Sequence, residues 1–342
     1  MVKDSNMLPE VPFPWQNSQW QRLAQQYEER LLPHAFLVCG DQGLGKSLFV
    51  RGFSRYMLCQ NPLKQFACGI CRNCRQAGED FNHPDVLHIA PLEGKRDINV
   101  EQIRSLINFI VHTSHAGIAK IAIIDAAHHL NISSANALLK TLEEPTLNSY
   151  LFLVTEFPGS LPATTRSRCQ RVLFSSPARE VAQQWLNSKS LPESVVDIDR
   201  LLEAAECRPL YAIQLAEQGA VEQRDQFLNK LYQLSTGSQS PQSLVSLALK
   251  IGESAVIGHL LLTSSILIKS LSSNQRPGES ANEIDNLYSL LIARERPTRT
   301  LLVELMQFYD AVIVARKQML SGTNPNGQLI MESLIWRWYQ FI

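Results

Sequence analysis

A short glycine-rich segment constrains the fold of this chain more than any other feature. Residues 40–47 read Gly-Asp-Gln-Gly-Leu-Gly-Lys-Ser and match the pattern G-x-x-x-x-G-K-[ST]. An apolar run at residues 35–39 precedes the segment, and a helical pattern over residues 48–58 follows it. A strand, a glycine-rich turn and a helix in this order form a P-loop, whose backbone N–H groups surround a phosphate. The segment therefore predicts an α/β domain with a phosphate site.

The residue types in this loop suit a nucleoside triphosphate. Gly40, Gly43 and Gly45 let the backbone wrap a phosphate, and Lys46 would reach the β- and γ-phosphates. The hydroxyl of Ser47 would join the shell of a Mg²⁺ ion. We therefore predict ATP or ADP with Mg²⁺ as the ligand. The alternative interpretation is a retained loop that stays empty or holds nucleotide only structurally.

Four more apolar runs follow in the first half of the chain. They lie at residues 86–89, 121–124, 151–154 and 171–174. Helical patterns separate them, one capped by Asn99 and another beginning at Ser133 or Ser134. Apolar strands alternating with helices indicate a parallel sheet that is covered on both faces. After about residue 176 the strand patterns stop, and we predict a small helical domain at 177–220 and a helical bundle at 221–342.

Composition and charge exclude several classes of protein. Hydrophobic residues make up 45% of the 342, which excludes wholesale disorder. Lys and Arg number 32, as do Asp and Glu, so the chain lacks the positive charge of a protein that holds DNA on its own. The uncharged stretch at residues 254–268 is too short and too polar for a membrane span, and we expect a buried helix there. Without a signal-peptide pattern at the start, we expect a cytoplasmic protein with no membrane partner.

An acidic residue is expected at the end of a later strand. Asp125 follows the run at 121–124 and is the predicted carboxylate of the Mg²⁺ shell. ATP-hydrolysing relatives of this fold carry Glu at the next position, where it polarises the attacking water. Here Ala126 follows, and the loss of a general base removes about 10²- to 10⁴-fold in rate. His128 or His129 could substitute, but we favour the interpretation that both lie on the surface at a helix entry.

Four of the seven cysteines form a cluster in the sequence. Cys59, Cys68, Cys71 and Cys74 have the spacing C-x₈-C-x₂-C-x₂-C. Four thiolates complete a tetrahedral Zn²⁺ shell with no open position, which predicts a structural zinc site rather than a catalytic one. His83 is an alternative ligand, although four sulfurs suffice.

Two polar positions follow the fourth predicted strand. Thr155, at the end of that strand, is where a polar sensor of the γ-phosphate would lie. Arg168 lies in the segment Ser-Arg-Cys at residues 167–169. An arginine at a domain edge can act as a finger that stabilises charge on a neighbour's γ-phosphate. The alternative for a single arginine is a surface ion pair.

Together these segments resemble the bacterial DNA polymerase III clamp-loader subunits, which are AAA+ ATPases. The resemblance rests on the P-loop, the cysteine cluster, residues 83–85 (His-Pro-Asp), residues 136–145 (Asn-Ala-Leu-Leu-Lys-Thr-Leu-Glu-Glu-Pro) and Ser-Arg-Cys. Near the C-terminus, Gly322 and Asn324 add to it. Motor subunits of the gamma/tau type carry Asp-Glu where this chain has Asp125 and Ala126, whereas subunits of the delta prime type lack the Glu. The chain is similar to the second type.

The resemblance implies an AAA+ domain at 1–176 with the zinc module at 59–74, a lid domain at 177–220 and an oligomerising collar at 221–342. It implies a subunit of the DNA-directed DNA polymerase holoenzyme, a nucleotidyltransferase, whose own ATPase is weak or absent. The partners would be motor subunits and a delta-type subunit in a hetero-pentamer, the sliding clamp, and primed DNA through the complex. Arg168 would then face the ATP of an adjacent motor subunit during DNA replication.

Two other functions stay open on the sequence. The first is an active motor-type ATPase, which needs a general base from another position. The second is a zinc-dependent nucleic-acid-binding module with a vestigial nucleotide fold, which the zero net charge disfavours.

Overall fold

The computed structural model describes residues 11–77, 83–92, 95, 97–189, 191, 197–217, 219–277, 282–293, 296–320 and 326–341. The chain forms two compact units, one of Met1–Ser188 with Glu206–Tyr211 and the other of Lys189–Ala205 with Ala212–Ile342. Gly322 and Asn324, which contribute to the family resemblance, lie outside the described residues. The three predicted domain ranges stay predictions.

A five-stranded parallel sheet forms the centre of the first unit. Its order is β2-β3-β4-β1-β5, and every neighbouring pair is parallel. All five predicted strands are present, so the prediction of a parallel α/β sheet is confirmed. The strands are β1 (Ala35–Cys39), β2 (Val86–Ile89), β3 (Lys120–Ile124), β4 (Ser149–Thr155) and β5 (Gln170–Leu173).

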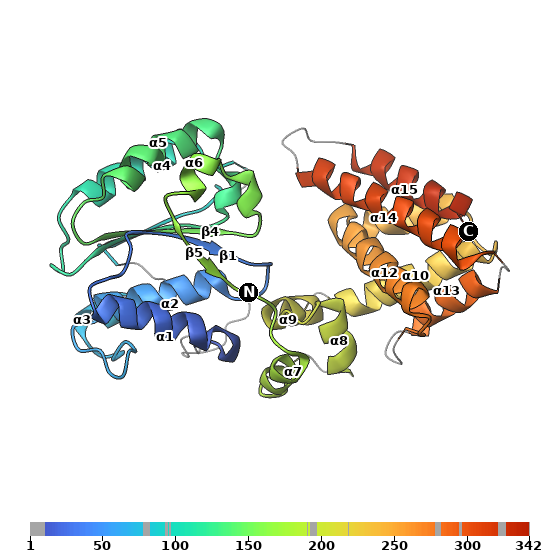
Figure 1. Ribbon diagram of the computed structural model, residues 1–342, viewed down its shortest axis with the longest axis horizontal. Coiled ribbons are helices and arrows are strands. Elements are labelled where there is room, and N and C mark those ends of the chain that lie inside the picture. Colours follow the sequence, from blue (N-terminus) through green and yellow to red (C-terminus); the bar gives the residue numbers. More distant parts are fainter. Residues whose placement is uncertain are drawn as a thin grey trace. The chain divides into compact units, whose positions relative to one another are not determined.

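Helices cover both faces of this sheet (Figure 1). Helices α1 (Asn17–Glu28) and α2 (Lys46–Leu58) lie on one face, and α4 (Val100–Val111), α5 (Ile132–Glu143) and α6 (Ala163–Arg166) lie on the other. Successive residues of the inner strands β3, β4 and β1 alternate between two cores: in β1, Phe36 and Val38 pack on the α2 side, whereas Ala35 and Leu37 pack on the α5 side. Burial on both faces explains why the strands read as continuous apolar runs.

Of the three predicted helix starts, one agrees with the structure and two do not. Asn99 caps α4 as predicted, because its side chain accepts a hydrogen bond from the backbone N–H of Gln102 at 2.9 Å. Helix α5 begins earlier than the predicted Ser133 or Ser134, because Asn131 accepts from the N–H of Ser134 at 2.8 Å and caps the helix. Helix α2 begins at Lys46, within the P-loop motif.

The remaining elements are short 3₁₀ turns and further helices. The 3₁₀ turns are η1 (Pro14–Gln16), η2 (Ala127–His129) and η3 (Pro158–Ser160). The other helices are α3 (Arg72–Gln76), α7 (Arg179–Asn187), α8 (Ile198–Ala204), α9 (Pro209–Glu217), α10 (Ala220–Ser235), α11 (Pro241–Ile251), α12 (Glu253–Ser273), α13 (Asn282–Ile292), α14 (Thr298–Leu320) and α15 (Gly327–Phe341).

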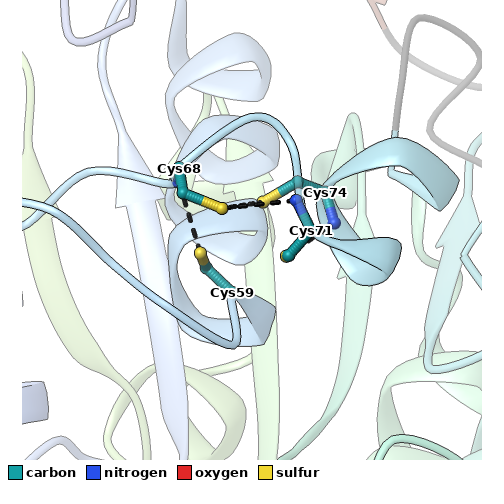
Figure 2. Close-up of side chains that lie close together, drawn as sticks. All are labelled: Cys59, Cys68, Cys71 and Cys74. Atoms are coloured by element: carbon teal, nitrogen blue, oxygen red, sulfur yellow. Dashed lines mark hydrogen bonds between the residues drawn. The ribbon is translucent and has the colours of Figure 1, made fainter.

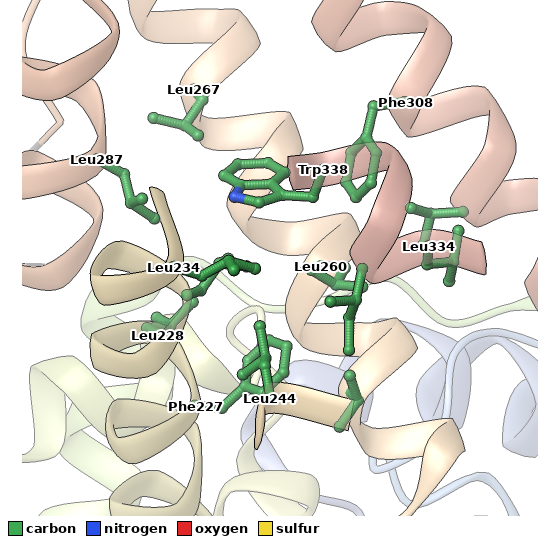
Figure 3. Packing of buried hydrophobic residues seen from close by; sticks show 14 of the residues in the cluster. Phe227, Leu228, Leu234, Leu244, Leu260, Leu267, Leu287, Phe308, Leu334 and Trp338 are labelled. Carbon is green, nitrogen blue, oxygen red and sulfur yellow. The ribbon is translucent and has the colours of Figure 1, made fainter. Parts of the chain in front are cut away.

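The second unit has a core made of helices alone. Trp338 of α15 is fully buried there and meets the Phe308 ring of α14 edge-on at 5.0 Å between centroids (Figure 3). Its indole N–H donates to the Ser235 hydroxyl at 3.0 Å, which satisfies the one polar atom of the side chain. Helix α12 is long and apolar enough to cross a membrane, but its Leu260 and Leu267 belong to this core, as expected for a bundle helix.

A buried ion pair lies where β2 and β3 begin. Asp85, in the His-Pro-Asp segment, is fully buried and lies 3.3 Å from the Lys120 ammonium. It also accepts backbone N–H bonds from His115 and Ala116, each at 2.7 Å, and a hydroxyl bond from Ser114 at 3.0 Å. Burial acts to raise the pKa of Asp85, but these donors outweigh burial and hold that pKa below its usual value. Asp85 thus ties the loop that precedes β3 to the strand edge.

We expect the substitution Asp85→Ala to lower the free energy of unfolding by about 3–5 kcal/mol, because it leaves the Lys120 ammonium buried without its partner. The pKa of Asp85 is lowered on folding, so its contribution is complete above the unfolded pKa of about 3.9 and is lost as pH falls further. Urea unfolding at pH 7 measures the effect. Exposed Asp97 gives the control, Asp97→Ala, which should change the value by less than about 0.5 kcal/mol. Equal stability of the two variants would contradict this role.

Candidate nucleotide site and cysteine cluster

The strand order brings the predicted nucleotide residues together. The P-loop follows β1, Asp125 follows β3, and Thr155 ends β4, which lies between those two strands. The carboxyl ends of parallel strands lie at one edge of a sheet, and ligands bind there where the direction of strand connection changes. Residues that are far apart in the sequence therefore surround one cavity.

That cavity has a volume of about 370 Å³. Of the predicted residues, all but Gly40 line it. Gly40 instead begins the loop against β5, where a side chain would come within 2.5 Å of the Phe174 carbonyl oxygen. Gly43 adopts φ +80° and packs against Tyr211, which leaves no room for a side chain. The lining residues are Gln42, Gly43, Gly45, Lys46, Ser47, Leu48, Asp125, Ala126, His128, Val154, Thr155, Glu156 and Leu210.

Asp125 is held by groups from two elements, α2 and β2. The Ser47 hydroxyl of α2 donates to one carboxylate oxygen at 2.5 Å, and the imidazole of His88 on β2 contacts the other oxygen. The guanidinium of Arg51 lies 4.0 Å from that second oxygen. Burial acts to raise the pKa of Asp125, but the bonds from His88 and Ser47 and the charge of Arg51 outweigh it and lower the pKa. The group is therefore a carboxylate at neutral pH, as a metal ligand must be.

Lys46 carries a buried positive charge at the other side of the cavity. Its ammonium donates to the Asp41 carbonyl oxygen at 2.6 Å, and the side chain is nearly inaccessible to solvent. Burial lowers the pKa of this ammonium, and the nearby carboxylates of Glu156, Asp41 and Asp125 oppose that change. A phosphate that enters the cavity would meet this cation and the loop N–H groups together.

No carboxylate occupies the position that follows Asp125. Ala126 stands there with φ +49°, in the left-handed region. The interpretation that both histidines lie on the surface was wrong for His128, because η2 turns it into the cavity with its Nδ1 atom 3.3 Å from the Thr155 hydroxyl. Glu156, the residue after Thr155, also lines the cavity.

The sequence did not reveal that residues 15–16 hydrogen-bond to the backbone of the P-loop. Gln16 is fully buried and donates to the carbonyl oxygens of Leu44 and Gly45 at 2.8 and 3.2 Å. The indole N–H of Trp15 donates to the same Leu44 oxygen at 3.0 Å. These bonds hold the carbonyl oxygens of Leu44 and Gly45 and so fix the end of the loop that leads into α2. The aromatic cluster Phe-Pro-Trp at residues 13–15 was the signal that could have indicated a buried contact.

The four predicted metal ligands come together in the structure (Figure 2). The Sγ atoms of Cys59, Cys68, Cys71 and Cys74 all lie within 4.8 Å of one another, and those of Cys68 and Cys74 are 4.0 Å apart. Zn–S bonds of about 2.3 Å in a tetrahedron place sulfur atoms about 3.8 Å apart. The cluster could therefore hold a metal ion after small side-chain movements.

Backbone N–H groups point at these sulfurs. Those of Cys68, Cys71 and Cys74 donate to the Sγ atoms of Cys59, Cys68 and Cys71 at 3.2, 3.4 and 3.4 Å. Burial acts to raise the pKa of Cys71, yet hydrogen bonds lower it to about 6, which favours the thiolate that a metal requires. His83 instead accepts from the Asp85 N–H through its Nδ1 atom at 3.0 Å.

Arg168 lies outside the cavity of its own chain. It follows α6, and its guanidinium makes an ion pair with Glu143, the last residue of α5, at 2.5 Å. It also donates to the carbonyl oxygen of Thr164 at 2.8 Å. The side chain is 35% exposed. The isolated chain thus shows the surface ion pair, and the finger role stays a prediction.

Comparison with known proteins places the chain in a family. The family described as "DNA polymerase III, delta subunit" matches residues 15–178. DNA polymerase III subunit delta′ of Escherichia coli strain K12 is 31% identical over 331 residues, which cover 95% of this chain and 94% of that protein. The corresponding protein of Pseudomonas aeruginosa is 28% identical over 95% of this chain and 97% of its own length. The chain belongs to the delta′ family.

The match to a motor-type relative is shorter. Subunit tau of DNA polymerase III from Escherichia coli strain K12 is 31% identical over 189 residues, which cover 54% of this chain and 29% of that protein. The delta′ relatives therefore align with the helical part of the chain as well as the sheet, whereas the tau alignment covers little more than half of the chain.

Proposed function

We propose that this chain is a subunit of the DNA polymerase III clamp loader that binds nucleotide without hydrolysing it. The observation that carries the proposal is the cavity itself: it has the Lys46 cation and the Ser47–Asp125 pair, but Ala126 where a hydrolysing site has Glu. Membership of the delta′ family supports it, because the relatives are named as subunits of DNA polymerase III. The chain would act in replication, in the cytoplasm.

The proposed ligand is ATP or ADP with Mg²⁺. The P-loop N–H groups and Lys46 would hold its phosphates, and Ser47 and Asp125 would supply oxygen ligands to the metal. Thr155, at the end of β4, would contact the terminal phosphate through its hydroxyl. With Ala126 next to Asp125, the attacking water lacks its usual base, so the bound nucleotide stays intact.

The purified chain alone should bind ATP and Mg²⁺ but turn it over about 10²- to 10⁴-fold more slowly than a motor subunit, because the general base is missing. Phosphate release measures turnover, and a fluorescent ATP analogue measures binding. Lys46→Ala should abolish binding and serves as the control.

Rapid hydrolysis by the lone chain would instead favour the motor-type ATPase. Glu156 and His128 both line the cavity and are the candidate bases for that function. The variants Glu156→Gln and His128→Ala would then identify which group activates the water.

Within the assembly, we propose that Arg168 serves the nucleotide of a neighbouring motor subunit. Its guanidinium is partly exposed and is not among the groups that line its own cavity, as a finger acting on another chain requires. The partners would be motor subunits and a delta-type subunit in a hetero-pentamer, which acts on the sliding clamp and primed DNA. Residues 1–176 would form the AAA+ domain, 177–220 the lid and 221–342 the collar.

Replacing Arg168 with Ala in the reconstituted complex should leave assembly intact and lower the ATPase rate that clamp and primed DNA stimulate. An arginine finger contributes about 10³-fold or more to the rate at the site it contacts. The total ATPase rate should therefore fall by the fraction that the adjoining motor site normally contributes. Arg166→Ala, two residues away at the end of α6, is the matched control. An unchanged stimulated rate would remove the finger role.

We propose that the cysteine cluster binds a structural Zn²⁺ ion. Four thiolates satisfy a tetrahedral ion, so the site would have no position for substrate. The ion would cross-link the end of α2, where Cys59 follows the last residue, to the short helix α3 that holds Cys74.

Substituting Cys74 with Ser should reduce zinc in the purified protein from about one equivalent to none, because one of four ligands is lost. Elemental analysis measures the metal, and thermal unfolding should show a lower Tm. Cys207→Ser, outside the cluster, should keep both values. A Cys74 variant with full zinc content would contradict the site.

A further inference from the structure

The ten-residue segment 136–145 has no role in the function proposed above, although it is the most distinctive part of the family resemblance. The structure connects it to Arg168 through Glu143. We propose that Glu143 is a positioning residue, which holds the guanidinium of Arg168 in the orientation that a neighbouring subunit's phosphate requires. This inference rests on the proposed finger role of Arg168.

Two anchors act on different nitrogens of the guanidinium. One terminal nitrogen donates to the Thr164 carbonyl oxygen at 2.8 Å, and the other pairs with Glu143 Oε1 at 2.5 Å. Thr164 lies in α6, only four residues before Arg168, so this bond restrains the side chain only relative to its own segment of the chain. Glu143 belongs to a different helix, and its bond fixes the direction of the planar group.

Helix α5 and the residues on either side of α6 share one hydrophobic core. Leu138 and Leu142 of α5 are buried with Leu161 and with Cys169, the residue next to Arg168. The backbone at both ends of the ion pair is therefore fixed by packing. The ion pair adds a restraint on the two side chains.

The anchored guanidinium still has hydrogen-bonding capacity for a phosphate. Arginine has five N–H donors, and the two anchors use two of them. Three remain for a ligand, enough for the two-pronged contact with phosphate oxygens that arginine favours. A carboxylate beside the guanidinium thus orients it without occupying all of its donors.

The test uses the full chain in the reconstituted complex with clamp and primed DNA. The quantity to compare is the Arg168-dependent rate, defined as the wild-type ATPase rate minus the rate of the Arg168→Ala complex. Glu143→Gln should lower this rate about two- to fivefold at saturating ATP. This factor corresponds to the free energy that an exposed ion pair typically contributes. The KM for ATP should not change, because Glu143 does not touch the nucleotide.

Three further variants make the result specific. Glu144→Gln, the adjacent exposed carboxylate, should keep the wild-type rate. Glu143→Asp keeps the charge with a shorter reach and should give an intermediate rate. The double variant with Glu143→Gln and Arg168→Ala should match Arg168→Ala alone, because Glu143 acts only through Arg168.

The outcomes separate this inference from the function on which it rests. A wild-type rate in Glu143→Gln, with a loss in Arg168→Ala, overturns the positioning role and leaves the finger. No loss in Arg168→Ala overturns the finger and the inference with it. A faster rate in Glu143→Gln, or a further loss in the double variant, would also overturn the inference, since the pair would then restrain Arg168 from acting or Glu143 would act elsewhere.

Discussion

The hydrogen bond between Ser47 and Asp125 is the interaction on which the site depends. It joins the first turn after β1 to the end of β3, across the intervening strand β4. The bond forms only because the connection after β1 carries the chain to the far edge of the sheet and later strands return toward β1. Parallel pairing then sets all three carboxyl ends at one edge. The cavity, its cation and its carboxylate follow from that order of strands.

The buried cation of Lys46 and the carboxylate of Asp125 line the same cavity. Burial disfavours both the Lys46 ammonium and the Asp125 carboxylate; the neighbours of Asp125 outweigh this effect on its pKa, whereas the carboxylates near Lys46 only oppose it. His88 and Arg51 stabilise the Asp125 carboxylate from positions that do not line the cavity, and Ser47, which does line it, donates to the other carboxylate oxygen. What the site lacks is a carboxylate after Asp125. This arrangement supports the proposed function, in which the chain would hold a nucleotide without cleaving it.

Two segments of the family resemblance have distinct physical roles. The His-Pro-Asp segment is structural, because Asp85 neutralises a buried lysine and accepts two loop N–H groups. The segment that ends α5 reaches the surface and holds Arg168. The first secures the sheet and the second orients an exposed cation. Their different burial explains the difference: a fully buried carboxylate must be satisfied, whereas a half-exposed one can exchange partners with solvent or with a ligand.

The five strands, the phosphate loop, the cap at Asn99 and the cysteine cluster could all be predicted from the sequence, because each has a pattern of residues that lie close together along the chain. The folded chain was needed to find that His88 contacts Asp125, that Gln16 donates to the P-loop backbone and that Glu143 pairs with Arg168. It also turned His128 into the cavity, against the surface interpretation. These partners are separated by long stretches of sequence, and periodicity carries no record of which strand ends or helix ends will meet. Packing of the two cores against the sheet selects those contacts, so they exist only once the whole domain has folded.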